Sequence, residues 1–213
     1  MNGAVTLINP ATARPIRDVG RAGVEDVDAV IARAKHIQRA WAGIAPVARA
    51  DALRRFARVV EDHVEELAQL EVLNSGHPIE SARWEASHVA QVLNYYAGAP
   101  ERLSGRQIPV SGGLDVTFHE PYGVVGIIVP WNFPMTTASW GFAPALAAGN
   151  AVVLKPAELT PLTAMRLEQL AVEAGLPDGL FTVVTGSGSV VGQRFVTHPA
   201  VRKICFTGSI EVG

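Results

Sequence analysis

Residues 123–155 carry the pattern that decides the fold, and their sequence is GVVGIIVPWNFPMTTASWGFAPALAAGNAVVLK. An apolar run covers 124–130, a helix-forming segment follows at about 134–148, and a second apolar run covers 151–155. Strands that are buried on both faces are apolar throughout, and two parallel strands need a long crossover, usually a helix. The stretch therefore predicts a strand–helix–strand unit of a parallel sheet.

The same alternation continues toward the last residue. Apolar runs recur at 181–185 and 203–207, and helical segments are expected at about 160–174 and 189–197. Strands that alternate with helices in this way form a sheet that is covered by helices on both faces. We expect an α/β fold with a doubly wound, Rossmann-like parallel sheet. These residues are expected to form only part of such a sheet.

Helical periodicity dominates the residues before this sheet. Apolar residues recur at three- and four-residue steps from Val24 to Trp41, which predicts one amphipathic helix. A second helix is expected from about residue 47 or 49 to 73, and a third over 79–96, each ended by glycine and proline. Residues 107–120 then predict a β-hairpin, with short strands at 107–110 and 114–120.

Composition excludes several functional classes. The chain has 18 basic and 20 acidic residues among 213, whereas a nucleic-acid binder usually presents a basic face. With 48% hydrophobic and 18% charged residues, the composition is that of a globular protein. Residues 1–20 lack the apolar stretch of a signal peptide, and the most apolar run is shorter than the roughly 20 residues that span a bilayer. We therefore expect a soluble, cytoplasmic protein without nucleic-acid or membrane partners.

The single cysteine and the histidines give no sign of a disulfide or a metal site. Cys205 lies in the middle of an expected strand between two apolar residues, so a buried structural thiol is the better interpretation than a nucleophile. The six histidines include no pair three to five residues apart, which is the spacing of two ligands on one helix. We expect no metal site.

The first expected strand ends in Pro130-Trp131-Asn132-Phe133-Pro134. Ligands of parallel sheets bind at the carboxyl ends of the strands. Two prolines that bracket Asn132 would fix its backbone, and a rigid amide N–H donor is what an oxyanion hole needs. On turn chemistry alone, an asparagine beside prolines is more often a turn residue, so both interpretations stay open here.

The second expected strand ends in Lys155, and Glu158 follows it three residues later. An acidic residue after a strand can accept hydrogen bonds from ribose hydroxyls, and an ammonium can donate to the same sugar or to a phosphate. Lysine and glutamate in a loop are, however, more often simply solvated.

Glycine-rich turns follow the third and fourth expected strands. The turn at 186–192 has the pattern GxGxxxG, one residue longer than the usual dinucleotide fingerprint, and the turn at 208–213 would open a helix. Backbone N–H groups and the Ser209 hydroxyl would suit a pyrophosphate. Tight sheet packing also requires glycine at strand ends, so neither turn is specific by itself.

Taken together, these segments resemble the aldehyde dehydrogenase superfamily over essentially the whole chain. The motifs PWNFP, PALAAGN, VVLKPAE with the following TPL, AGLPDG and FTGSIEVG stand in the order and spacing of that family. Before them, the INPAT opening, the NSGHP segment and the hairpin that precedes EPYGVVG also fit.

The resemblance implies a reaction and assigns residues to it. An aldehyde would be oxidised by hydride transfer to NAD, after attack by a cysteine thiolate, and a glutamate-activated water would release the acid. Asn132 would be the catalytic oxyanion donor, while Lys155 and Glu158 would hold the adenosine ribose. The remaining expected cofactor contacts are Ile128, Val129, Pro130, Trp131, Gly188 beside the adenine, and Gly208 and Ser209 at the pyrophosphate. The Glu158 carboxylate would repel a 2′-phosphate, so we expect NAD to be preferred over NADP.

The resemblance also implies an organisation of the chain. Residues 1–105 would form a helical part, 106–120 a hairpin of the kind used in homo-oligomers, and 121–213 the dinucleotide-binding core. Residues 1–213 contain no counterpart of the family's nucleophilic cysteine or of its glutamate base, so the isolated chain is expected to be inactive. Three hypotheses remain: the N-terminal part of a dehydrogenase, a non-catalytic nucleotide-binding module, and an interaction fragment that pairs with a full-length relative.

Overall fold

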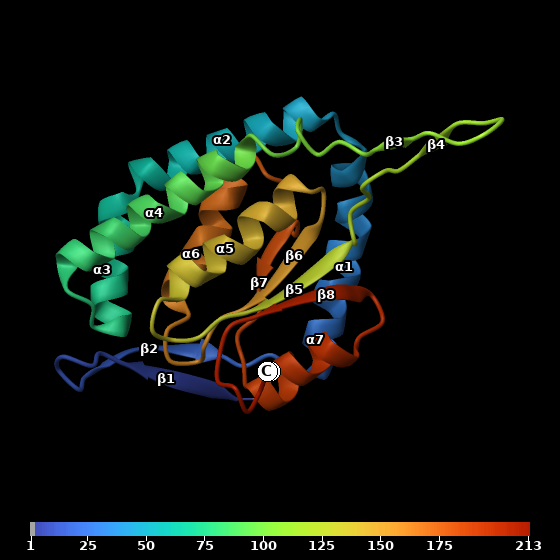
Figure 1. The fold of residues 1–213 in the computed structure, drawn as a ribbon. Helices are drawn as coiled ribbons and strands as arrows, with labels where there is room; N and C mark the ends of the chain where they lie inside the picture. Colours follow the sequence, from blue (N-terminus) through green and yellow to red (C-terminus); the bar gives the residue numbers. More distant parts are fainter. Residues whose placement is uncertain (1–2) are drawn as a thin grey trace.

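The centre of the structure is a parallel sheet of four strands (Figure 1), seen in a computed structural model that describes residues 3–213. The strands are β5 (Val124–Ile128), β6 (Ala151–Lys155), β7 (Phe181–Val183) and β8 (Val201–Phe206), in the spatial order β7-β6-β5-β8. All three neighbouring pairs are parallel. The parallel α/β sheet that the apolar runs predict is thus confirmed.

Helices cover both faces of this sheet. Among them are α5 (Pro134–Ala147), α6 (Leu162–Glu173), the π-helical turn η1 (Gly188–Gly192) and α7 (Gln193–Thr197). Consecutive strand residues point to opposite faces. Gly141 of α5 lies against Ile127, whereas Phe195 of α7 lies against the neighbouring Gly126. The connections after β5 and β7 therefore run on opposite faces, which is the doubly wound arrangement.

The N-terminal helices are α1 (Val24–Gly43), α2 (Pro46–Asp62), α3 (Val64–Ser75) and α4 (Ile79–Ala97). The single helix expected from about 47 or 49 to 73 is wrong, because the structure divides it into α2 and α3 at His63. The imidazole Nδ1 of His63 donates to the Val59 carbonyl at 2.7 Å. The backbone N–H of His63 donates to the Val60 carbonyl at 3.1 Å instead. The side chain thus takes the acceptor that a continuing helix would use.

Two antiparallel pairs flank the helices. The pair β1 (Ala4–Ile8) and β2 (Pro15–Gly20) is not among the elements that the sequence predicts. The expected hairpin forms from β3 (Gln107–Ile108) and β4 (Asp115–Val116), with shorter strands than expected, and it projects from the body of the molecule (Figure 1). Every residue from 101 to 120 is exposed, so no packing extends this ladder.

The core joins the helices to the sheet. Phe56 of α2, Phe142 of α5 and Phe181 of β7 are fully buried, and their ring centroids lie 4.8 to 6.4 Å apart. Cys205 is only partly buried, contrary to the expectation, because β8 is an edge strand within residues 3–213. None of the helices described in this range is long and apolar enough to cross a membrane.

Candidate functional site

The carboxyl end of β5 lies between the ends of two neighbouring strands. The backbone N–H of Val129 donates to the carbonyl of Lys155 at 3.1 Å, and that of Thr207 donates to the carbonyl of Ile128 at 3.0 Å. Because the apolar strands are parallel neighbours, their carboxyl ends lie at the same edge of the sheet. The segment Ile128, Val129, Pro130 and Trp131 therefore begins at the middle of this edge.

Asn132 lies in an exposed loop whose two ends are fixed. Its neighbour Trp131 is held through its carbonyl, which accepts from the Thr160 hydroxyl at 3.3 Å. On the other side, the Phe133 carbonyl accepts from the Thr137 hydroxyl at 2.7 Å, and Pro134 begins α5, where its missing N–H is harmless. The Asn132 side chain makes no hydrogen bond within residues 3–213, so its amide is free to donate to a ligand instead of closing a turn.

Lys155 is the last residue of β6 and Glu158 follows three residues later, but the two side chains differ in their surroundings. Lys155 is buried, and its ammonium donates to the Pro156 carbonyl at 3.0 Å. Burial lowers the pKa of this ammonium, and the Glu158 carboxylate acts in the opposite direction. An ammonium has three N–H donors. Only one of them has a partner within the described residues, so a sugar hydroxyl or a phosphate oxygen would find a donor here.

Glu158 has a partner that the sequence does not indicate. The guanidinium Nε of Arg21 donates to Glu158 Oε1 at 2.7 Å, and the two side chains are 42% and 26% exposed. Arg21 follows β2 directly, 137 residues before Glu158. No local pattern could reveal this contact, because the β1–β2 pair that positions Arg21 was itself not predicted. The second carboxylate oxygen, Oε2, remains available to a ligand.

The glycine turn η1 packs over the ends of two strands. A side chain at Gly192 would contact the Ile128 Cδ1 at 3.7 Å and the Lys155 Cδ at 4.0 Å. Gly188, at the start of the turn, is exposed, and nothing in the protein lies within 4 Å of the position of its absent Cβ. The turn therefore brings open backbone surface to the edge where Lys155 and Ile128 lie.

The turn after β8 reaches the same edge. Gly208 and Ser209 are exposed and follow Thr207, which is bonded to the end of β5. The Ser209 carbonyl accepts from the backbone N–H groups of Val212 at 3.3 Å and Gly213 at 3.2 Å, so a turn begins at Ser209. The sequence-predicted residues of β5, β6, η1 and β8 thus come together at one edge of the sheet.

Three aromatic side chains form a cluster between α4 and α5, and they are Trp84, His88 and Trp140. The indole Nε1 of Trp140 donates to His88 Nε2 at 3.1 Å, and the His88 ring stacks on Trp84 with centroids 5.0 Å apart. Trp84, Phe133 and Trp140 are 43% to 55% exposed. Helical spacing alone did not distinguish these residues from core positions.

Asn74 also contributes, because it fixes the loop that carries Glu158. It is 5% exposed and bridges α3 to this loop. Its Nδ2 donates to the Leu159 carbonyl at 2.8 Å, and its Oδ1 accepts from the backbone N–H of Leu162 at 3.2 Å. Both backbone groups would lack these partners with an apolar residue at position 74.

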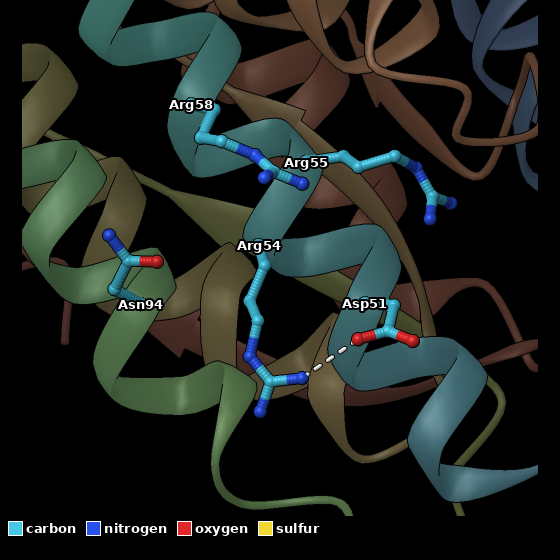
Figure 2. A pocket seen from close by; sticks show the side chains of 5 residues that line it. All are labelled: Asp51, Arg54, Arg55, Arg58 and Asn94. Atoms are coloured by element: carbon cyan, nitrogen blue, oxygen red, sulfur yellow. Dashed lines mark hydrogen bonds and ion pairs between the residues drawn. The ribbon is translucent and has the colours of Figure 1, made fainter.

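A hollow of about 470 Å³ lies elsewhere, on the outer surface of α2 and α4 (Figure 2). Its lining side chains are Asp51, Arg54, Arg55, Arg58 and Asn94. Arg54 pairs with Asp51 at 2.8 Å, and Arg55 donates to the Ala174 carbonyl at 3.3 Å. No buried polar group points into this hollow, and it lies on helices outside the strand ends, so it is not the candidate site.

Comparison with known proteins points to one family. The family model described as "Aldehyde dehydrogenase family" matches residues 2–213. The phenylacetaldehyde dehydrogenase of Pseudomonas fluorescens is 48% identical over 98% of this chain and 44% of its own length. The chain thus spans less than half the length of this curated relative.

Solved structures agree with this match. An aldehyde dehydrogenase from Bacillus cereus, solved as an NAD⁺ complex, is 40% identical and has a TM-score of 0.96 over 99% of this chain and 44% of its own. An NADP-dependent enzyme from E. coli is 37% identical, with a TM-score of 0.97 over the same shares. The chain belongs to the aldehyde dehydrogenase family.

Proposed function

We propose that this chain provides the cofactor site and the oxyanion donor for the NAD-dependent oxidation of an aldehyde to a carboxylic acid. The observation that carries the proposal is the convergence of Ile128, Lys155, Gly188 and Ser209 at the carboxyl edge of one parallel sheet, beside the loop of Asn132. Family membership supports it, since two solved relatives carry NAD⁺ or depend on NADP by their own descriptions.

The residues at this edge fit a dinucleotide. The two unused donors of Lys155 and the free Oε2 of Glu158 match ribose hydroxyls, which both donate and accept hydrogen bonds. The open surface at Gly188 admits an adenine without a clash, and the exposed turn at Gly208 and Ser209 offers donors to the pyrophosphate. The bound nicotinamide would supply the hydride acceptor.

Asn132 has a separate task. When a nucleophile adds to an aldehyde, the carbonyl oxygen gains negative charge, and an amide N–H that is already fixed in place stabilises this charge without reorganisation. The bonds at Trp131 and Phe133 hold the loop, and the Asn132 amide is not engaged elsewhere among residues 3–213. The resemblance implies that the nucleophile and the base would lie in the part of the relatives that this chain does not span.

Preference for NAD over NADP is the finer part of the proposal. Glu158 brings one negative charge toward the expected ribose, and a 2′-phosphate would bring a second. Arg21 and Lys155 offset part of this repulsion, and a nearby arginine is a known way to accommodate that phosphate. We therefore infer a preference and not an exclusion.

An apolar aldehyde is the substrate class that we propose. The exposed ring of Phe133 follows Asn132 directly at the start of α5, and the exposed ring of Trp140 lies further along the same helix. A relative named for phenylacetaldehyde is 48% identical, which supports an aryl-substituted substrate.

A chimera tests the proposal directly. Residues 1–213 would be joined to the remaining part of the Pseudomonas fluorescens relative, and NADH formation from phenylacetaldehyde would be measured. We expect turnover, and Asn132→Ala should lower kcat about 10²–10³-fold while NAD binding persists. If the chimera binds NAD and its kcat is unchanged by Asn132→Ala, the proposed role of Asn132 is contradicted. A polypeptide of residues 1–213 alone is expected to bind NAD without forming NADH.

The division into 1–105, 106–120 and 121–213, the homo-oligomeric assembly and the cytoplasmic location stay predictions.

A further inference from the structure

A cluster of three metal-ligating side chains lies beneath the loop of Asn132. Glu71 comes from the last turn of α3, His77 from the connection to α4, and Glu85 from α4 itself. One ligand atom from each lies within 4.8 Å of the other two. The sequence did not indicate this group, because its members come from two helices and a loop and share no helical spacing.

The cluster is buried and has two carboxyl groups but only one base. Glu71 and Glu85 are 1% and 0% exposed, and no lysine or arginine forms an ion pair with either among the described residues. His77 Nδ1 lies 2.5 Å from Glu85 Oε1, so a single imidazole faces two carboxylates. Burial raises the pKa of both carboxyl groups, because it disfavours their charged forms.

The Glu71 carboxyl group has no hydrogen-bond partner among residues 3–213. Both of its oxygens are buried without a hydrogen bond, and the Ser75 hydroxyl donates to the Glu71 main-chain carbonyl at 2.8 Å instead. A buried carboxylate without a partner is strongly unfavourable, and structures avoid it through pairing or metal coordination. The unpartnered carboxyl group is therefore suited to a positively charged ligand.

We propose that Glu71, His77 and Glu85 form a binding site for a divalent transition-metal cation, with Zn²⁺ as the best match. An imidazole nitrogen with two carboxylate oxygens suits zinc and its neighbours, whereas Mg²⁺ and Ca²⁺ prefer oxygen ligands alone. Three protein ligands around zinc lie roughly 3.4 Å apart in tetrahedral geometry, so the His77–Glu85 contact of 2.5 Å would lengthen, and any distance from Glu71, at most 4.8 Å, that exceeds this spacing would shorten. A water would complete the coordination.

The site would act on the loop that carries Asn132. The His77 ring packs against the Phe133 ring, with centroids 5.3 Å apart, and the Thr136 hydroxyl lies 3.5 Å from Glu85 Oε2. A cation that fixes His77 and Glu85 therefore also fixes the start of α5. The proposed role is structural, since none of the three ligands contacts the strand ends in the described contacts.

Zinc titration of the chelator-treated protein tests the proposal. Isothermal titration calorimetry with ZnCl₂ should give one equivalent per chain, and MgCl₂ should give no comparable binding. Glu71→Gln and His77→Gln should each weaken zinc at least about tenfold, since even the loss of a group that only supports a ligand weakens binding about 10–100-fold. The matched controls Glu25→Gln and His36→Gln alter exposed residues of α1 without ion pairs and should leave the affinity unchanged.

Cobalt spectroscopy supplies a readout that does not depend on whether the variants fold. Co²⁺ bound to the wild-type protein should show the visible bands of a four- or five-coordinate site with nitrogen and oxygen ligands. Thiolate charge-transfer bands would indicate Cys205 instead and would overturn the proposal. Absence of stoichiometric zinc binding, or equal binding by His77→Gln and His36→Gln, would also overturn it.

Discussion

Replacement of Glu158 by serine should remove most of the discrimination between NAD and NADP. Arg21 occupies Oε1 of this carboxylate at 2.7 Å, which leaves Oε2 as the acceptor for a ribose hydroxyl. Loss of one charge-assisted hydrogen bond costs about 1.5–3 kcal/mol, which raises the Kd for NAD about 10- to 160-fold. NADP should bind equally well or better, because its 2′-phosphate no longer meets a carboxylate.

A second variant, Arg21→Met, should have the opposite effect and increase the ratio of the Kd for NADP to the Kd for NAD. Without its ion pair, the Glu158 charge is less compensated and should repel a 2′-phosphate more strongly. The pair is partly exposed and contributes only about 0–1 kcal/mol to folding, so this variant should remain folded. Arg21 thus tests the electrostatic reasoning independently of the serine substitution.

Calorimetric titration of both cofactors into the wild-type protein and the variants provides the measurement. Glu25→Ser, an exposed change on α1, is the control and should leave both Kd values unchanged. Tighter binding of NADP by the wild-type protein, or an unchanged ratio in Glu158→Ser, would refute the placement of the carboxylate at the ribose.

Three further outcomes are expected. Asn74→Ala should destabilise the protein by about 1–3 kcal/mol, because two backbone groups lose their buried partner. This corresponds to a fall in Tm of about 2–12 °C by calorimetry, and an unchanged Tm would contradict it. Burial raises the pKa of Glu168 to about 7 from 4.5, so the folded state binds this proton more tightly and stability should decrease as pH rises through this interval. The variant Glu168→Gln should lack that part of the pH dependence of Tm. A pH profile of Tm identical to that of the wild-type protein would contradict the raised pKa of Glu168. In the hairpin, Leu114 and Phe118 are 75% and 81% exposed, so changing both to serine should reduce the oligomer size measured by light scattering. Val196→Ser, at a 64% exposed position on α7, is the control, and equal sizes of both variants would exclude the hairpin from the interface.

The sheet could be predicted because its signal is local and strong. The runs that became β5 and β6 are apolar throughout, and the parallel arrangement then fixed which residues share an edge. Lys155 and Gly188 were predicted to lie at that edge for this reason. The division of one expected helix at His63 was not predictable, because it depends on a side chain that competes for a single backbone carbonyl.

The features that the sequence did not predict depend on contacts between segments that lie far apart in the chain. The partner of Glu158 is Arg21, which lies 137 residues earlier in the chain and directly after the β1–β2 pair. Glu71, His77 and Glu85 likewise meet only when α3 and α4 pack together. A sequence pattern reports neighbours along one element, so side chains that meet across elements leave no periodic signal.

Hydrogen–deuterium exchange with saturating NAD tests the central claim, which is that the carboxyl edge of the sheet binds the dinucleotide. The account predicts slower exchange in the backbone at 128–132, 155–158, 187–192 and 207–209. The segment 51–58, which lines the arginine-rich hollow on α2, should be unaffected and serves as an internal control. Slower exchange confined to 51–58, or no change at the strand ends while NAD is bound, would contradict the account.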